Sequence, residues 1–324
     1  MFVIRRPLQR VCRAASLTWS RSLASLLVEP ASSLLDEEVT VSGCQLEPGS
    51  EVRLETLLKD REQRFHFQSV CHYQTDDSGE FSTARQPPLP ASQYRGLHRS
   101  GPLWSLQPRP GFRPRLWPED IRKALQYELS LSCPQSGQVL ATARAEKYFL
   151  TQAVRRVEVR EGPLRAVLFL PPNPGPAVIT IYGGVNRGRV PEDRWVASST
   201  AGAKLIFFKR SKTFFYNSRA ALLASYGFVT LALAFFGVEG LPAVYSSFEI
   251  SYFELAVDFL LSHPHVSHRA GVGVFGQSMG GSLALAMMSC LGAKLACCVV
   301  AGSQFVISPG MALSITNQFS PGTN

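Results

Sequence analysis

The chain has 324 residues, 45% of them hydrophobic and 18% charged, so it can bury a sizeable core in one or two domains. Its net charge is +9, and much of this charge is local, from the arginines at 5, 6, 10, 13 and 21 that precede any acidic residue, so we expect no nucleic-acid partner. The seven cysteines contain no C-x-x-C pair, which argues against a zinc site and a disulfide framework, and we expect no cofactor.

Residues 1–26 are rich in Arg and Ser and contain no Asp or Glu. Apolar residues lie between the arginines, as in a mitochondrial transit peptide. A disordered basic tail would have a similar composition. The pattern predicts a mitochondrial location, with the cytosol and the peroxisome as alternatives, although the chain ends Pro-Gly-Thr-Asn324 without a Ser-Lys-Leu signal.

Residues 28–155 have a β-type pattern, because apolar and polar residues alternate in short runs separated by turn-rich segments. About seven such strands with this spacing predict an all-β, immunoglobulin-like sandwich domain. The runs are Val39–Ser42, Val52–Glu55, Phe65–Val70, Gly79–Ser82, Leu103–Leu106, Tyr127–Leu131 and Val139–Ala143.

Residues 156–324 have a different pattern, in which short apolar strands alternate with helices. Strands that are apolar on both faces predict a parallel sheet covered by helices, and therefore an α/β domain. The most apolar region, 283–301, is broken by Gly292 and contains Lys294, so we expect a helix and a strand there and no integral membrane span. The expected strands are Ala166–Leu170, Ala177–Ile181, Phe228–Ala234, Val272–Phe275 and Leu295–Ala301, and the helices are Ala220–Tyr226, Phe248–Ser262 and Ser282–Leu291.

Gly276-Gln-Ser-Met-Gly280 lies between a predicted strand and a predicted helix. This context fits the G-x-S-x-G nucleophile elbow of α/β-hydrolases. Ser278 is therefore the candidate nucleophile, and the N–H of Met279 is a candidate oxyanion donor. A glycine-rich turn with an incidental serine is the alternative.

Five longer segments, within roughly residues 28–305, carry a resemblance to one family: Glu146–Leu150, Val167–Pro176, Ala220–Phe228, Tyr252–Pro264 and Gly276–Gly281. In this order they are similar to the type I acyl-CoA thioesterases and the bile acid-CoA:amino acid N-acyltransferases. The resemblance implies a β-sandwich followed by an α/β-hydrolase domain, acyl-CoA as the substrate, and an acyl-enzyme on the elbow residue. Serine at position 278 favours a thioesterase, because the acyltransferases usually carry cysteine, whereas Met279 departs from the lysine common there.

The expected chemistry is attack on the thioester carbonyl by a serine, which a histidine activates and a carboxylate orients. A second oxyanion N–H should come from the loop after Ala177–Ile181, where Gly184 and Val185 are the candidates. Glycines in this loop suit close backbone approach, although a simple βα loop would also contain them.

The sequence departs from the family pattern in two places. About 25 residues, Trp195–Arg219, separate the glycine loop from the helix at Ala220, and they are either a spliced or mispredicted segment or a genuine lid or surface loop. No Asp, Glu or His follows Ser278, so the family's acid and base would lie beyond Asn324 and the α/β-hydrolase domain would be incomplete.

An earlier histidine is a poor substitute for the missing base. His263, His265 and His268 precede the elbow strand. A five-residue strand would separate them from Ser278 by roughly 15 Å. Hydrogen-bond reach is about 3 Å, so we do not expect any of them to serve as the base.

Two classes of function remain open. The first is an acyl-CoA thioesterase that releases fatty acid and CoA, with activity impaired in these 324 residues, or an acyl-CoA:amino acid N-acyltransferase in which an amine replaces water. The second is a non-catalytic isoform that binds acyl-CoA without turnover. Acyl-CoA is the expected partner in each case, and the sequence predicts no oligomeric state.

Overall fold

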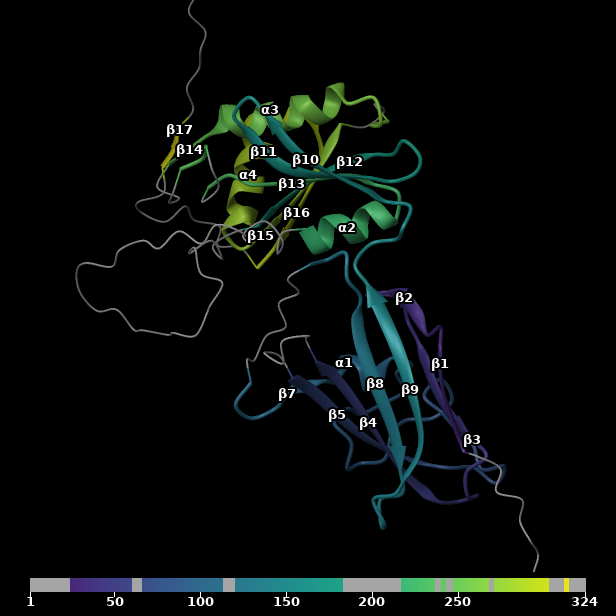
Figure 1. The fold of residues 1–324 in the computed structure, drawn as a ribbon. Helices are drawn as coiled ribbons and strands as arrows, with labels where there is room; N and C mark the ends of the chain where they lie inside the picture. Colours follow the sequence, from purple (N-terminus) through teal and green to yellow (C-terminus); the bar gives the residue numbers. More distant parts are fainter. Residues whose placement is uncertain are drawn as a thin grey trace, which may run out of the picture.

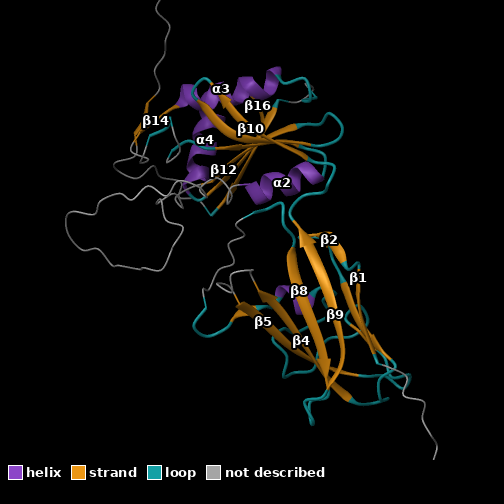
Figure 2. Cartoon of the chain, viewed as in Figure 1, coloured by secondary structure: helices purple, strands orange, loops and turns teal. Residues whose placement is uncertain are grey.

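The computed structural model forms two units, a β unit made of β1–β9 and an α/β unit made of β10–β17 (Figure 1). Figure 2 shows that the longer helices all lie in the α/β unit. The residues described are 24–59, 66–112, 120–182, 217–236, 240–242, 247–267, 271–302 and 312–314.

The β unit contains two sheets whose strands alternate buried and less buried residues. In β4, for example, Val52, Leu54, Thr56 and Leu58 are buried, whereas the residues between them are only partly buried. Successive side chains on a strand point to opposite faces, so this alternation buries one face of the sheet. The three-stranded sheet has the order β1 (Ser25–Glu29), β3 (Thr40–Cys44), β6 (Phe81–Ser82), and the six-stranded sheet has the order β2 (Ser32–Leu34), β9 (Val139–Tyr148), β8 (Leu125–Ser132), β4 (Glu51–Lys59), β5 (His66–Gln74), β7 (Gln107–Pro108).

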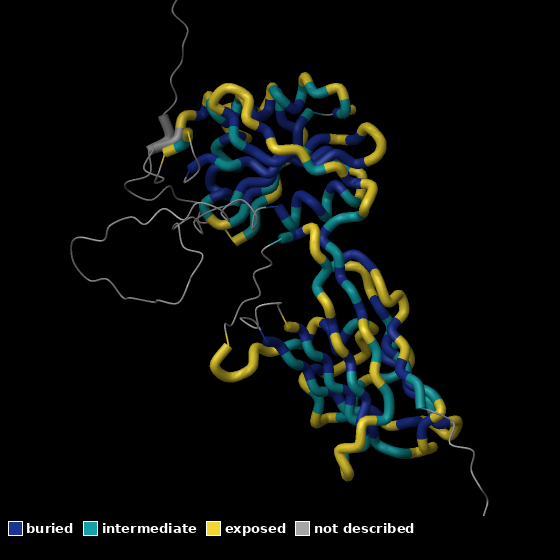
Figure 3. The backbone as a smooth tube through the Cα atoms, in the orientation of Figure 1, coloured by how far each residue is buried: buried dark blue, intermediate teal, exposed yellow. Residues whose placement is uncertain are grey.

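One hydrophobic core joins the two sheets of the β unit. Val41 and Phe81 from the smaller sheet pack with Leu54, Tyr73 and other buried residues from the larger one. The Tyr73 ring stacks on the Phe81 ring with 4.9 Å between centroids. Figure 3 shows the buried residues running along the inside of this unit. The predicted β-structure of this region is confirmed.

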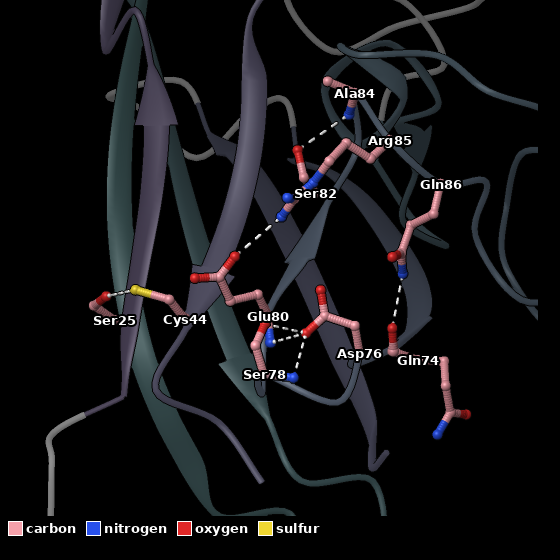
Figure 4. A network of polar contacts seen from close by, with 10 residues as sticks. All are labelled: Ser25, Cys44, Gln74, Asp76, Ser78, Glu80, Ser82, Ala84, Arg85 and Gln86. Atoms are coloured by element: carbon pink, nitrogen blue, oxygen red, sulfur yellow. Dashed lines mark hydrogen bonds and ion pairs between the residues drawn. The ribbon is translucent and has the colours of Figure 1, made fainter. Parts of the chain in front are cut away.

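A polar turn closes the end of this unit between β5 and β6 (Figure 4). Oδ1 of Asp76 accepts bonds from the Ser78 hydroxyl at 2.6 Å, the Glu80 N–H at 2.9 Å and the Ser78 N–H at 3.0 Å. The Ser78 hydroxyl, followed by the Glu80 N–H, lowers the pKa of the Asp76 carboxyl from its usual value. The Asp76 carboxylate therefore adds three hydrogen bonds to the backbone bonds that close the turn.

One local prediction in this unit is wrong, and the end of one predicted segment changes. Residues 103–106 do not form a strand, because α1 (Gly101–Trp104) is a helical turn with Pro102 near its start, where proline is favoured. The predicted leader 1–26 overlaps β1, which begins at Ser25, and the Leu26 side chain is buried in the core. Burial of Leu26 in the sheet places the end of any leader before Ser25.

The α/β unit is built on a six-stranded mixed sheet, whereas the sequence predicted a parallel one. Strands β13, β12, β15 and β16 pair in parallel, but β10 and β11 pair antiparallel, as do β11 and β13. The first of these pairs follows from the short connection through Gly162, whose φ is 51°, because a hairpin forces the two strands that it joins to run in opposite directions. The order is β10 (Arg155–Glu161), β11 (Leu164–Leu170), β13 (Val229–Leu233), β12 (Ala177–Tyr182), β15 (Val272–Gln277), β16 (Leu295–Ala301).

Helices cover both faces of this sheet (Figure 1). One face packs on α2 through Ala220, Ala221 and Ala224, whose small side chains allow close approach. The other face packs on α3 and α4 through larger residues such as Phe253 and Met287. The elements are α2 (Asn217–Ser225), α3 (Ile250–Ser262), α4 (Met279–Leu291), a 3₁₀ turn at Gly292–Lys294, and a short parallel pair, β14 (Ser247–Glu249) with β17 (Ala312–Ser314).

The apolar region 283–301 folds as most of α4, the 3₁₀ turn and β16, as the sequence predicted. Among the described helices, none combines the length and the apolar character needed to cross a membrane.

The two units meet at α2, which lies between the mixed sheet and the β unit (Figure 1). The alanine face of α2 shares a core with Ile121, Phe149 and Val154. The Thr151 N–H also donates to the Ser225 Oγ at 3.0 Å. The helix therefore contributes to both units.

The start of α2 corrects the predicted boundary of the inserted segment. Trp195–Arg219 lies mostly outside the described residues, but Asn217–Arg219 form the first turn of α2 and Asn217 is fully buried. The three residues therefore belong to the fold and not to an insertion.

Candidate active site

Ser278 occupies a sharp turn between β15 and α4. Its φ is 56° and its ψ is −128°, a conformation that residues other than glycine rarely adopt. Two backbone bonds hold it there. The Ser278 N–H donates to the Ala301 carbonyl at 2.9 Å, and the Gly281 N–H donates to the Ser278 carbonyl at 2.9 Å.

The glycines around Ser278 are required by steric contact. A Cβ on Gly276 would lie 2.2 Å from the Gly280 carbonyl oxygen and 2.7 Å from the Ala284 Cβ. A Cβ on Gly280 would lie 2.4 Å from the Ile181 carbonyl oxygen. Any side chain at these positions would push strand and helix apart, so the G-x-S-x-G spacing follows from the close approach of β12, β15 and α4.

The turn exposes the serine beside the start of a helix. Ser278 is exposed, whereas Met279 is half-buried and begins α4. The first N–H groups of a helix have no partner within the helix, and the helix dipole places partial positive charge there. No acidic residue lies in the first turn of α4 to offset this. The site therefore suits a negative charge developing next to Ser278.

The strand that leads to the predicted second oxyanion donor ends beside the elbow. Tyr182, the last residue of β12, pairs in parallel register with Gln277, the residue before Ser278. The structure thus brings together the carboxyl ends of β12 and β15. Gly184 and Val185 lie outside the described residues, and their role stays a prediction.

Arg219 is a side chain at this site that the sequence did not single out. Its guanidinium carbon lies 4.1 Å from the centroid of the Phe275 ring and 5.3 Å from that of the Tyr182 ring. Its Nη1 donates to Gln277 Oε1 at 3.1 Å. The sequence signal for this residue is an arginine directly before the predicted alanine-rich helix at Ala220. The sequence does not reveal which strands that helix contacts, so it could not place Arg219 at the site.

The histidines before β15 lie at the end of the strand opposite Ser278. His263 follows α3, and its pKa is lowered by burial, then by His265 and Arg155. His265 Nε2 lies 2.8 Å from the carbonyl oxygen of Pro171. Both precede the amino end of the strand whose carboxyl end carries Ser278, as predicted, whereas His268 lies outside the described residues.

The other histidines contact residues of the β unit. His72 Nδ1 lies 2.8 Å from Glu51 Oε1. His66 packs edge-on against Phe112, and its pKa is lowered by burial and by nearby cationic side chains. Across the described segments, no three His, Cys, Asp or Glu side chains gather as a possible set of metal ligands.

Two family models match the chain, the first over most of the β unit and β10, and the second within the α/β unit. The model described as "Acyl-CoA thioester hydrolase/BAAT N-terminal region" matches residues 36–161. The model described as "BAAT / Acyl-CoA thioester hydrolase C terminal" matches residues 248–320, which include the elbow. Among solved structures, the alpha/beta hydrolase GrgF from Penicillium sp. sh18 is 17% identical, with a TM-score of 0.32 and 46% of each chain covered.

Three curated relatives are similar to most of the chain. Acyl-coenzyme A thioesterase 2, mitochondrial, from Mus musculus is 36% identical over 94% of this chain. Acyl-coenzyme A thioesterase 1 from Homo sapiens is 37% identical over 86%, and peroxisomal succinyl-coenzyme A thioesterase from Mus musculus is 36% identical over 87%. The chain spans 61% of the length of each of these relatives. The two models and these relatives agree, and the chain belongs to the acyl-CoA thioester hydrolase/BAAT family.

Proposed function

We propose that the protein hydrolyses fatty acyl-CoA thioesters with Ser278 as the nucleophile. The observation that carries the proposal is the exposed serine at a positive-φ turn between β15 and α4. This is the arrangement by which α/β-hydrolases present a nucleophile. The relatives are named as acyl-coenzyme A thioesterases, which supplies the substrate class.

The proposed reaction has two steps. Ser278 Oγ attacks the thioester carbonyl carbon as its proton passes to a base, and the C–S bond breaks to release CoA as the thiol. Water then attacks the acyl-serine and releases the fatty acid. The Met279 N–H is the proposed donor to the oxyanion, with a second donor from Gly184 or Val185. Loss of one such donor typically costs 10²–10³ in rate.

The base and the acid of this mechanism are not assigned among these 324 residues. α/β-Hydrolases place both after the nucleophile, and no Asp, Glu or His follows Ser278 in the 324 residues. Serine without a base is a poor nucleophile. We therefore expect a polypeptide of these residues alone to form acyl-serine slowly, with turnover below about 1 s⁻¹, the low end of typical enzymes.

The test is reaction of the purified chain with palmitoyl-CoA, followed by intact mass and by thiol release. We expect one palmitoyl group, located on Ser278 by peptide mass, and none in Ser278→Ala. The control is Ser289→Ala, because Ser289 is also exposed and its hydroxyl donates within α4, to the Leu285 carbonyl. In any chain with sustained turnover, Ser278→Ala should lower the rate by several orders of magnitude.

Two results would count against this assignment. One is acylation of a residue other than Ser278. The other is thiol release by Ser278→Ala within tenfold of the parent. Sustained turnover by the 324 residues at about 1 s⁻¹ or faster would show that an unidentified base serves Ser278.

Amino acid N-acylation is the second candidate, because the matched C-terminal family model carries the BAAT name as well as the hydrolase name. The same acyl-enzyme would be attacked by an amine instead of water. Addition of glycine or taurine separates the two, since a hydrolase yields free fatty acid and an acyltransferase yields the amide. Serine at the elbow leads us to expect the free acid.

We also propose the finer organisation of the chain. Residues 28–155 would form an immunoglobulin-like sandwich domain, extended to include β1, and residues 156–324 would belong to an α/β-hydrolase domain. Two sheets around one core support the first assignment, and the elbow between a parallel strand and α4 supports the second.

For location, we propose mitochondrial import directed by the first residues. The support is their Arg-rich, acid-free composition and the mitochondrial name of one relative, although another relative is named as peroxisomal. Residues 1–24 fused to a fluorescent protein should enter mitochondria, because Ser25 already belongs to β1. Replacing Arg5, Arg6, Arg10 and Arg13 by Gln should prevent import. Diffuse cytosolic fluorescence of the unmodified fusion would refute the proposal.

A further inference from the structure

Arg219 joins three structural elements that meet at the candidate active site. It lies in the first turn of α2. Its guanidinium covers the rings of Phe275, from β15, and Tyr182, from β12. Its Nη1 donates to the side chain of Gln277, also from β15. One side chain therefore contacts the carboxyl ends of both strands.

These strand ends lead directly into the two segments that the proposed chemistry uses. Gln277 directly precedes Ser278 in the sequence, and Tyr182 precedes the loop that contains Gly184. Tyr182 and Gln277 are also register partners in the sheet. Any shift of one strand end relative to the other would change the spacing between nucleophile and oxyanion loop.

The chemistry of the contacts explains why arginine suits this position. A guanidinium is planar, so it can lie over an aromatic ring while its edge donates hydrogen bonds. Within the described residues no carboxylate forms an ion pair with Arg219, so its partners are two ring faces and one amide. A lysine would keep the charge but lose the flat stacking surface.

Gln277 and Phe275 project to the side of the sheet opposite α4. Gly276, between them, faces Ala284 of α4, and successive side chains on a strand alternate. The elbow is therefore supported from two sides. The packing of Gly276 and Gly280 fixes it against α4, and Arg219 fixes it from α2.

We propose that Arg219 is a positioning residue, which holds the ends of β12 and β15 together and thereby fixes the Ser278 turn. Its effect on the reaction rests on the proposed function of Ser278, whereas its effect on the turn does not. Misplacement of reacting groups by about 1 Å can cost on the order of 10² in rate.

The direct test is amide hydrogen exchange at the turn, which requires no activity. The N–H groups of Ser278 and Gly281 are both hydrogen-bonded, so their exchange rates report opening of the elbow. In Arg219→Met we expect both to exchange at least tenfold faster, while the amides of Leu283–Met287 within α4 change by less than threefold. Arg219→Lys should give an intermediate rate, and Gln277→Leu a smaller increase than Arg219→Met.

The control is Arg122→Met, because Arg122 is exposed and pairs with Asp120 in its own turn of the β unit. It should leave the elbow amides unchanged. A purely structural role for Arg219 would instead raise exchange to a similar degree across α2, the sheet and α4. That result, or elbow exchange in Arg219→Met equal to the parent, would overturn the proposal.

A second measurement separates this inference from the proposed function. The rate at which palmitoyl-CoA acylates Ser278 should fall at least tenfold in Arg219→Met, with less than a threefold change in the concentration for half-maximal rate. If Ser278→Ala is acylated as fast as the parent, the proposed function fails while the exchange result still decides the role of Arg219. If the parent is acylated at Ser278 and Arg219→Met matches its rate, the positioning role in the reaction fails.

Discussion

At the scale of single residues, the absence of side chains at Gly276 and Gly280 is what lets a strand, a turn and a helix meet at Ser278. The two positions would each place a Cβ within 2.4 Å of a carbonyl oxygen. Backbone atoms cannot rotate away as a flexible side chain can. The strained serine is therefore held by its neighbours and not by its own preference.

Gly276→Ala should consequently destabilise the protein and remove acylation of Ser278. Overpacking of this kind costs about 1–3 kcal/mol in the free energy of unfolding. Urea unfolding measures the loss, and the palmitoyl adduct measures the effect on the site. Gly292→Ala is the matched control, because nothing lies within 4 Å of its added Cβ and its φ is −53°. Equal stability of the two variants would contradict the steric argument.

The contrast between Ser278 and Arg219 shows what local sequence can predict at this scale. Ser278 was predictable because strand, turn and helix follow one another in the chain and each has a local signal. Arg219 was not, because its partners Phe275 and Gln277 are distant in sequence, and the Arg219–Gln277 bond spans 58 residues. Their meeting depends on how α2 crosses the sheet, which composition does not reveal.

At the scale of elements, α2 shows how an inserted segment can share residues with the fold. The sequence placed the helix start at Ala220, but the structure starts it at Asn217. Deletion of residues 195–219 would join Glu192-Asp193-Arg194 to Ala220. The deletion thus replaces Asn217-Ser218-Arg219, the first turn of α2, by Glu192-Asp193-Arg194. An arginine still lies directly before Ala220.

We expect the 195–219 deletion to melt at or above the temperature of the parent. It retains the arginine and adds acidic residues at the start of α2, where they stabilise a helix by about 0.3–1 kcal/mol. In the deletion background Arg194→Met should speed elbow exchange as Arg219→Met does in the full chain, and in the full chain Arg194→Met should leave it unchanged. A deletion chain that melts well below the parent, or is less soluble, would show that residues 195–216 are integral.

Two other elements show where sequence patterns fail. β10 was missed, because its sequence, Arg-Arg-Val-Glu-Val-Arg-Glu, has few apolar residues, as suits a strand at the edge of the sheet. Residues 103–106 were assigned to a strand, although Pro102 and the contact of Gly101 with the Tyr94 ring fix a helical turn. In both cases the position in the tertiary structure overrides the local pattern.

At the scale of the whole molecule, the two units share a core at α2. Phe149 is 4% exposed and packs in the same cluster as Ala220 and Ala224. Such a cluster couples the unfolding of the β unit to that of the α/β unit, because opening the junction exposes apolar surface on both sides.

Phe149→Ala should therefore separate the unfolding of the two units. Truncation of a buried phenylalanine costs about 3–5 kcal/mol. We expect calorimetry to show one transition for the parent and two for this variant. Phe81→Ala is the control, since Phe81 is also buried but lies inside the β unit, and it should lower the melting temperature while a single transition remains. A single transition in Phe149→Ala would place the coupling elsewhere.

The shared helix also sets an order of events while the chain is being synthesised. Thr151 and its partner Ser225 are 74 residues apart, so the β unit leaves the ribosome well before α2 does. At about 5–20 residues per second, this delay lasts roughly 4–15 s. Throughout that interval Phe149 and Ile121 lack the alanine face of α2 to pack against. The nascent β unit therefore presents an apolar surface to the factors that bind nascent chains at the ribosome.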